Sequence, residues 1–116
     1  MTDIRAQRLY DVETDGRVHV LVDRLWPRGV RRDDPRIDRW CPDVGPSHEL
    51  RRWYAHDVVR FPEFADRYRA ELQSDAGRAA AERLRELVGD RPVSLLTAAR
   101  DLEHSQAAVL ARLLGG

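Results

Sequence analysis

The chain has 116 residues, of which 42% are hydrophobic, and its 20 basic residues balance 20 acidic ones. This length suits one domain and excludes two independent cores, and the apolar content excludes a disordered chain. Every basic residue is arginine, which excludes Schiff-base chemistry on lysine. The charge is also balanced locally, nine against nine in residues 1–46 and eleven against eleven in residues 47–116, so no extended basic surface for nucleic acid is expected. Any anion site must therefore be local.

The sequence predicts a cytoplasmic protein with no membrane segment. No apolar run approaches the roughly 18 residues that a membrane-spanning helix needs. The first five residues, Met1 to Arg5, include charges and lack the apolar stretch of a signal peptide. Cys41 is the only cysteine, which excludes an internal disulfide and a paired-cysteine zinc site. We expect Cys41 to be a small apolar filler beside Trp40.

The first third of the chain predicts two strands. Residues 4–10 alternate roughly between apolar and polar side chains and form a weak strand candidate. Residues 11–17 contain the pair Asp15-Gly16 and predict a turn. Residues 18–23 are almost continuously apolar, which is typical of a strand in a parallel sheet that is buried on both faces.

Residues 31–46 are charged and interrupted by prolines, and therefore predict a loop with a short helix over residues 35–41. Ser47 is a suitable N-cap for the first long helix. Leu50, Trp53 and Tyr54 would share one face of that helix.

Two further helices are expected before the next strand. Pro62 suits the first position of one helix, whose apolar residues recur at every third or fourth position from Phe61 to Leu72. Ser74 or Asp75 caps the other helix, which ends at Gly89.

A second buried strand, residues 93–97, leads into a final helix that Asp101 is expected to cap. This order predicts one α/β domain over residues 1–116, with a small, mainly parallel sheet flanked by helices. A right-handed crossover over residues 31–92 would join the two core strands and contain several helices.

Polar residues that folding alone does not require follow both predicted core strands. In open α/β sheets, ligands bind at the carboxyl ends of the strands, so we expect the two loops to form one rim. Guanidinium groups suit phosphate and carboxylate, and the first amides of the final helix would favour an anion. The residues expected on the rim are Asp23, Arg24, Trp26 and Arg28 in the first loop, and Thr97, Arg100, Asp101 and His104 in the second.

Each of these residues also has a purely structural explanation. The arginines of the first loop could pair with Asp23, Asp101 or other carboxylates as ion pairs of the fold. Trp26 could cover the edge of the sheet rather than stack on a ligand. Arg100 and Asp101 could form a salt bridge and a helix N-cap, and His104 could face water.

His56 and Asp57 follow the predicted first helix. A histidine beside an aspartate resembles an oriented general base, although neighbours in sequence rarely point at each other. His56 could instead hydrogen-bond to the carbonyl groups at the end of the helix. No HExxH, GxSxG, GxGxxG or P-loop pattern occurs, so the sequence identifies no cofactor and recommends no metal site.

Taken together, four blocks resemble the DUF488 family in its YeaO-like branch, over nearly the whole chain. They are VLVDRLWPRG at residues 20–29, PSHELRRWYAHD at 46–57, Phe64 with RYRAEL at 67–72, and LLTAARD at 95–101 with Glu103-His104. The resemblance implies a compact α/β domain of a small bacterial or archaeal cytoplasmic protein, with no established activity. The family positions present here are Asp23, Arg24, Trp26, Pro27, Arg28, Gly29, His56, Asp57, Arg100, Asp101 and His104.

The chain departs from the family pattern at the start of the final helix. Gln106 stands where the family often has a second histidine, and the Cys-His-Arg run of the wider family is absent. A mechanism that needs a thiol or two histidines there is therefore not expected.

Three functional hypotheses follow from these residues. The first is a domain, either a binding protein or an enzyme, that binds a phosphate-, nucleotide- or carboxylate-bearing molecule. In it, Trp26 would stack on the ligand or close the pocket, and the anion would be held by Arg24, Arg28 and Arg100. A reaction would use His56 or His104 for proton transfer, with one of three carboxylates orienting it: Asp23, Asp57 or Asp101.

The second hypothesis is a non-catalytic binding or regulatory protein in which the same residues form an internal ion-pair network. The third is nucleic-acid binding, which the zero net charge disfavours. Helix faces rich in alanine and leucine are compatible with a homodimer.

Overall fold

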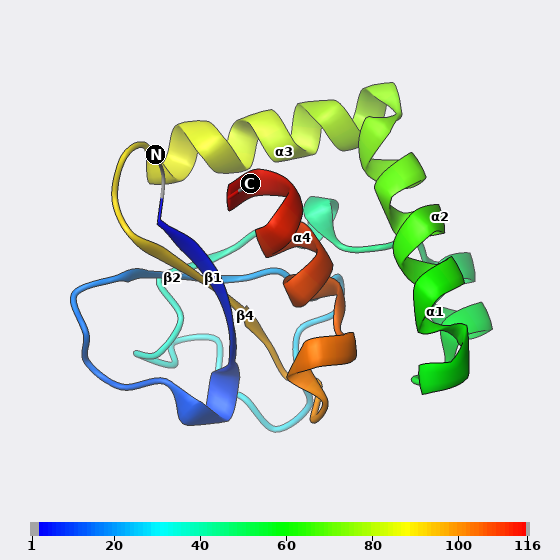
Figure 1. Ribbon diagram of the computed structural model, residues 1–116. Coiled ribbons are helices and arrows are strands. Elements are labelled where there is room, and N and C mark those ends of the chain that lie inside the picture. The colour runs from blue at the N-terminus through cyan, green and yellow to red at the C-terminus, as the bar shows by residue number, and fades with distance from the viewer. Residues whose placement is uncertain (1–2, 116) are drawn as a thin grey trace.

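The computed structural model describes residues 3–115 and contains a four-stranded parallel sheet (Figure 1). The strands lie in the order β1-β4-β2-β3, and every pairing between neighbours is parallel. Their bounds are Ile4–Arg8 for β1, Val18–Leu21 for β2, Arg39–Trp40 for β3 and Val93–Thr97 for β4. The predicted α/β fold with a small parallel sheet is therefore confirmed.

The central strand β4 is buried along its whole length, as its apolar sequence predicts. Alternate side chains of a strand point to opposite faces of the sheet. Val93 and Leu95 accordingly enter the larger apolar cluster, which also contains side chains of the helices, whereas Leu96 enters a smaller cluster on the other face. Burial on both faces explains the nearly continuous apolar run.

Four α-helices pack on the face of the larger cluster: α1 His48–Tyr54, α2 Phe61–Gln73, α3 Asp75–Val88 and α4 Gln106–Gly115. The predicted serine caps of α1 and α3 are present, because Ser47 Oγ accepts from the Leu50 amide and Ser74 Oγ from the Gly77 amide, both at 3.1 Å. Among residues 3–115, none of the helices combines the length and apolarity needed to span a bilayer.

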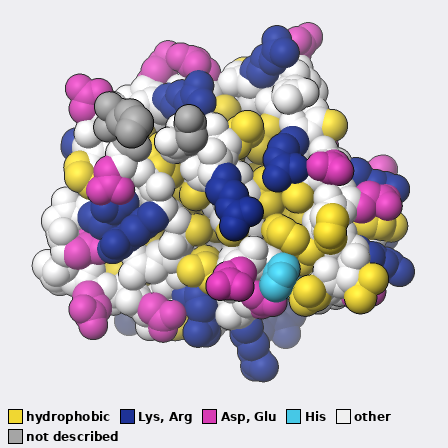
Figure 2. Space-filling view, in the orientation of Figure 1, with side chains coloured by type: hydrophobic (Ala, Val, Ile, Leu, Met, Phe, Trp, Pro, Cys, Tyr) yellow, Lys and Arg dark blue, Asp and Glu magenta, His cyan; other side chains and the backbone are white. Residues whose placement is uncertain are grey.

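The opposite face of the sheet is covered by irregular segments. Leu9, Leu21 and Leu96 form the smaller cluster there. Trp26 packs against it from the loop after β2, and Trp40 packs against it from β3. Figure 2 shows the visible surface, on which basic and acidic side chains are interspersed, as the balanced charge predicts.

The predicted helix over residues 35–41 is wrong, because this segment contains the edge strand β3. Arg39 and Trp40 pair with Val20 and Leu21 of β2. The Asp38 carboxylate accepts the His19 amide at 2.8 Å and the Trp40 indole donates to the Asp23 carbonyl at 2.8 Å. These long-range hydrogen bonds outweigh a weak helical pattern.

The predicted cap of the final helix is also wrong. Asp101 precedes a short 3-10 turn, Leu102–His104, and α4 begins only at Gln106. Ser105 caps it instead, since its Oγ accepts from the Ala108 amide at 3.3 Å.

The connection from β2 to β4 includes β3 and then α1, α2 and α3, which confirms a long helical crossover between the core strands. The chain after β2 runs toward β3, on one side of the sheet, whereas the chain after β4 forms α4, which packs beside β1 on the other side. The two connections diverge between β2 and β4, and such a divergence opens a crevice at the carboxyl ends of the strands.

Candidate functional site

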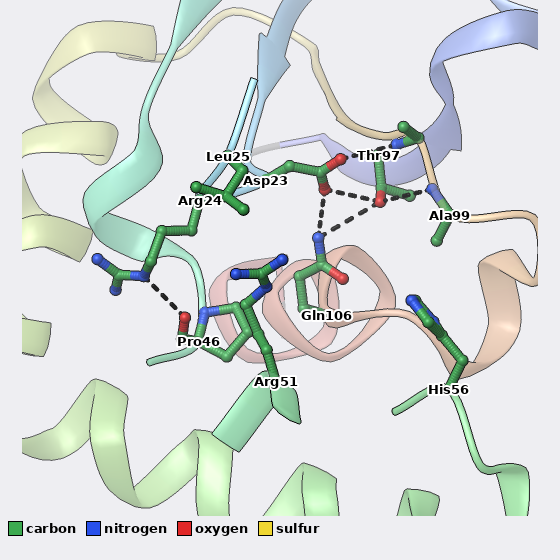
Figure 3. Close-up of a pocket in the computed structure, with 10 residues that line it drawn as sticks. Asp23, Arg24, Leu25, Pro46, Arg51, His56, Thr97, Ala99 and Gln106 are labelled. Carbon is green, nitrogen blue, oxygen red and sulfur yellow. Dashed lines mark hydrogen bonds between the residues drawn. The ribbon is translucent and has the colours of Figure 1, made fainter. Parts of the chain in front are cut away.

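A cleft of about 240 Å³ lies at the carboxyl ends of β2 and β4 (Figure 3). Its lining comes from the loop after β2, the segment before α1, α1 and its C-terminal end, the loop after β4, and the start of α4. The lining residues are Asp23, Arg24, Leu25, Pro46, Arg51, His56, Thr97, Ala98, Ala99 and Gln106. A smaller recess of about 80 Å³ shares Pro46, Arg51, His56 and Gln106 with the cleft and adds Tyr54, Phe64, His104 and Ser105.

The cleft floor, which we define as Asp23, Thr97, Ala98 and Gln106, is a closed hydrogen-bond network. Asp23 Oδ1 accepts from the Thr97 hydroxyl at 2.7 Å and from the Gln106 amide nitrogen, and Oδ2 accepts from the Ala98 amide at 2.9 Å. Burial raises the pKa of the Asp23 carboxyl, and these hydrogen bonds and the charge of Arg51 oppose that rise. Asp23 thus joins the ends of β2 and β4 to the start of α4.

Arg24 forms one edge of the cleft but points away from it (Figure 3). Its Nε donates to the Pro46 carbonyl at 2.7 Å and its Nη2 to the Gly45 carbonyl at 2.6 Å. A Cβ at Gly45 would lie 3.0 Å from the Arg24 amide nitrogen, so the two segments approach closely. Arg24 therefore fastens the loop after β2 to the segment before α1, through backbone carbonyls rather than the predicted aspartates.

The cleft walls, which we define as Leu25, Arg51 and His56, have no such partners. Arg51 projects from α1 into the cleft, and its guanidinium forms no hydrogen bond or ion pair with residues 3–115. His56 lines both the cleft and the recess. Ala55 and His56 both have left-handed backbone angles, with φ of 47° and 57°, which are uncommon for residues other than glycine. This turn after α1 directs the chain back toward the cleft.

The recess contains an oriented histidine. His104 Nδ1 lies 2.7 Å from Asp101 Oδ2, and its ring meets Phe61 edge-on at a centroid distance of 5.0 Å. The Tyr54 hydroxyl donates to the His104 carbonyl at 2.6 Å. Burial raises the pKa of that hydroxyl, and the nearby charges of Asp101 and Asp57 add to the rise.

Five predicted site residues lie outside the lining of both cavities: Trp26, Arg28, Asp57, Arg100 and Asp101. The Trp26 indole donates to the Val30 carbonyl at 2.7 Å, and its ring packs edge-to-face on Trp40 at 5.3 Å. Asp57 accepts the Val59 amide at 3.1 Å and so caps a 3-10 turn. Arg28 and Arg100 are exposed. The two loops thus meet, but through Asp23 and Thr97 rather than through their arginines.

Sequence reasoning missed Arg51 and Leu25 as lining residues and treated Gln106 only as a departure from the family pattern. Arg51 reaches the cleft because the crossover returns α1 to the strand ends, and no local pattern separates it from its neighbour Arg52. The position of Gln106 could have been predicted, since it is the first residue of the helix that follows the loop after β4. In the part of the chain that the structure describes, no three His, Cys, Asp or Glu side chains gather as metal ligands would.

Comparison with known proteins agrees with the motif resemblance. Residues 3–116 match a family model described as "Inactive DUF488-N3 subclade". An uncharacterised protein of Mycobacterium tuberculosis is 52% identical over 116 residues, which cover 99% of this chain and 96% of that protein, and one of Mycobacterium bovis matches equally. The uncharacterised protein YeaO of Escherichia coli K12 is 36% identical over 111 residues, 94% of each chain. No solved structure matches the chain. The chain therefore belongs to the DUF488 family, in the subclade described as inactive.

Proposed function

We propose that the cleft binds a small molecule carrying a phosphate, nucleotide or carboxylate group, and that it does so without catalysing a reaction. The observation that carries this proposal is the unpaired guanidinium of Arg51, which faces the cleft with no partner among residues 3–115. Asp23 is the one carboxylate in the lining, and the floor already supplies its hydrogen bonds. Guanidinium groups match phosphate and carboxylate oxygens in geometry and charge.

The absence of catalysis is proposed on two grounds. The family model carries the description "Inactive" for this subclade. In addition, both oxygens of the Asp23 carboxylate already accept hydrogen bonds from Thr97, Ala98 and Gln106, which weakens this carboxylate as a base or nucleophile. The cleft can hold an anion, and its buried carboxylate belongs to the fold.

The proposal is tested by anion binding to wild type and to Arg51→Gln. Thermal shift and calorimetry with inorganic phosphate, a nucleoside monophosphate and acetate should show binding by wild type. Arg51→Gln should weaken that binding at least about tenfold, since it removes the guanidinium that projects into the cleft. Arg52→Gln is the matched control, because Arg52 is exposed on the same helix and outside the lining, and it should bind as wild type.

Equal affinities of Arg51→Gln and Arg52→Gln would contradict the proposal. So would a wild-type protein that binds none of these anions at concentrations of about 10 mM, because a bidentate guanidinium contact worth about 3 kcal/mol corresponds to a dissociation constant of about 10 mM.

A second candidate function is acid–base catalysis in the recess, which one observation favours. Asp101 holds His104 Nδ1 at 2.7 Å, an arrangement that fixes the tautomer and orientation of a catalytic imidazole. Under this alternative, His104 moves a proton in the recess, which His56 also lines. Hydrolysis of a phosphate-ester panel tests it: Asp101→Asn should slow any turnover at least about tenfold and Arg100→Gln should not. No turnover of the panel by wild type would exclude this alternative for phosphate esters.

A further inference from the structure

We propose that the ligand of the cleft is a small organic anion whose apolar part packs against Leu25, an inference that rests on the anion binding proposed above. The starting observation is that Leu25 is 57% exposed and lines the cleft. It belongs to neither of the two apolar clusters among the described residues. Leu25 therefore contributes little to the core, and its side chain is open to a ligand.

The backbone of Leu25 is held in this position from both sides. Arg24 is fastened to the Pro46 carbonyl at 2.7 Å, and the Trp26 indole to the Val30 carbonyl at 2.7 Å. Pro27, the next residue, is buried. A leucine between such anchors cannot withdraw into the core without breaking their hydrogen bonds, so it stays at the mouth of the cleft.

Single exposed apolar side chains are ordinary on protein surfaces, so exposure alone says nothing about a ligand. Val59 is 88% exposed and Leu113 is 39% exposed, and neither lines the cleft. Leu25 differs from both because it shares a cavity with an unpaired guanidinium. Its position, rather than its exposure, indicates a ligand contact.

The rest of the lining has the same mixed character. Pro46, Ala98 and Ala99 also line the cleft and add apolar surface to that of Leu25. A hydrated inorganic ion would leave this apolar surface in contact with water. An organic group attached to the anion would cover the apolar surface and exclude water from it. The cleft, at about 240 Å³, is smaller than the 300–1,000 Å³ that is typical of drug-sized ligands, so the ligand is small.

The chemical class is thus an anion with a hydrocarbon or aromatic group next to it, either a phosphate monoester or a carboxylic acid. Two ligand pairs separate these sources: inorganic phosphate against phenyl phosphate, and acetate against phenylacetate. Dissociation constants for all four are measured by NMR titration of wild type, Leu25→Ser and Leu113→Ser. Leu113→Ser is the matched control, because it removes an exposed leucine outside the cleft.

In wild type, the phenyl member of at least one pair should bind about fivefold more tightly than its simple partner, and the pair that shows this identifies the anion. Leu25→Ser should reduce the ratio of the dissociation constants of the simple anion and its phenyl partner to about one, without changing the affinity for the simple anion. Leu113→Ser should keep the wild-type ratio. Melting curves should show Leu25→Ser as stable as wild type, because Leu25 lies outside the clusters.

A ratio of dissociation constants near one for both pairs in wild type would overturn the inference. A ratio that is unchanged in Leu25→Ser would overturn it as well. A marked loss of stability in Leu25→Ser would also overturn it, since the leucine would then serve the fold. In each of these cases, binding of the simple anions would leave the proposed function standing. Failure of wild type to bind any of the four ligands would overturn both.

Discussion

The floor and the walls of the cleft differ in how completely the protein satisfies their side chains. On the floor, Asp23 accepts hydrogen bonds from Thr97, Ala98 and Gln106, and these residues join two strands to a helix. On the walls, neither Arg51 nor His56 has a side-chain hydrogen bond to residues 3–115, and Leu25 is largely exposed. The side chains of the floor therefore stabilise the fold, whereas those of the walls are available to a ligand.

The largest expected effect is on the floor. Asp23→Ala removes the acceptor for three donors, among them the side chains of buried Thr97 and half-buried Gln106, and should lower the free energy of unfolding by about 3 kcal/mol. Urea denaturation followed by circular dichroism measures the change. Asp33→Ala is the control, since among residues 3–115 Asp33 pairs only with Arg31 and both side chains are exposed, and it should change stability by less than about 0.5 kcal/mol. Similar losses in the two variants would contradict a structural floor.

The pH dependence of stability should also set Asp23 apart. Burial raises its folded-state pKa above the unfolded value, so folding takes up a proton there and its contribution to stability falls as pH rises. The contribution of Asp34 to stability changes with pH in the opposite direction, because hydrogen bonds from the Arg36 side chain and amide lower the pKa of Asp34 to about 2. Its contribution is present above the unfolded pKa of about 4 and is lost as pH falls toward about 2.

Denaturant titrations at several pH values test these signs. The stability of wild type relative to Asp23→Asn should increase from about pH 7 to about pH 4, and relative to Asp34→Asn it should decrease below about pH 4. A difference from Asp23→Asn that shrinks on acidification would show that the carboxylate is not held in a buried floor.

A smaller effect is expected at Trp26, which belongs to the fold on the far side of the sheet from the helices. Trp26→Phe removes the hydrogen bond to the Val30 carbonyl and should lower the free energy of unfolding by about 1 kcal/mol. Anion affinity should stay at the wild-type value, because Trp26 does not line the cleft. A loss of affinity with unchanged stability would instead support the stacking role expected from the sequence.

The smallest effects are expected at the two exposed arginines of the motif loops. Arg28→Gln and Arg100→Gln should each change stability by less than about 0.5 kcal/mol and leave phosphate affinity unchanged. Calorimetric titration checks the affinity. A severalfold loss of phosphate affinity in either variant would show that the substituted arginine also contacts the anion.

The strands and helices could be predicted because their signals are local. The apolar run of β4 and the caps Ser47 and Ser74 are readable within a few residues. The edge strand β3 could not be predicted, since it depends on hydrogen bonds between Asp38, Trp40 and segments about 20 residues away. The start of α4 was misplaced because Asp101 and Ser105 are both good caps, and tertiary contacts decide between them.

The site was predictable in place but not in detail. Parallel strands end at one edge of the sheet, so the loops after β2 and β4 had to meet. Which side chains face the cleft depends on the path of the crossover, which brings Arg51 in and leaves Arg28 and Arg100 out. The left-handed turn at Ala55 and His56 could not be predicted, because it contains no glycine.

The most direct test of the account is a titration of isotope-labelled protein with inorganic phosphate, followed by amide chemical shifts. The account predicts saturable shifts confined to the cleft, at His56, Ala98, Ala99 and Gln106, which disappear in Arg51→Gln and persist in Arg52→Gln. Shifts spread over the surface arginines, or an unchanged response in Arg51→Gln, would contradict the claim that this cleft is an anion site.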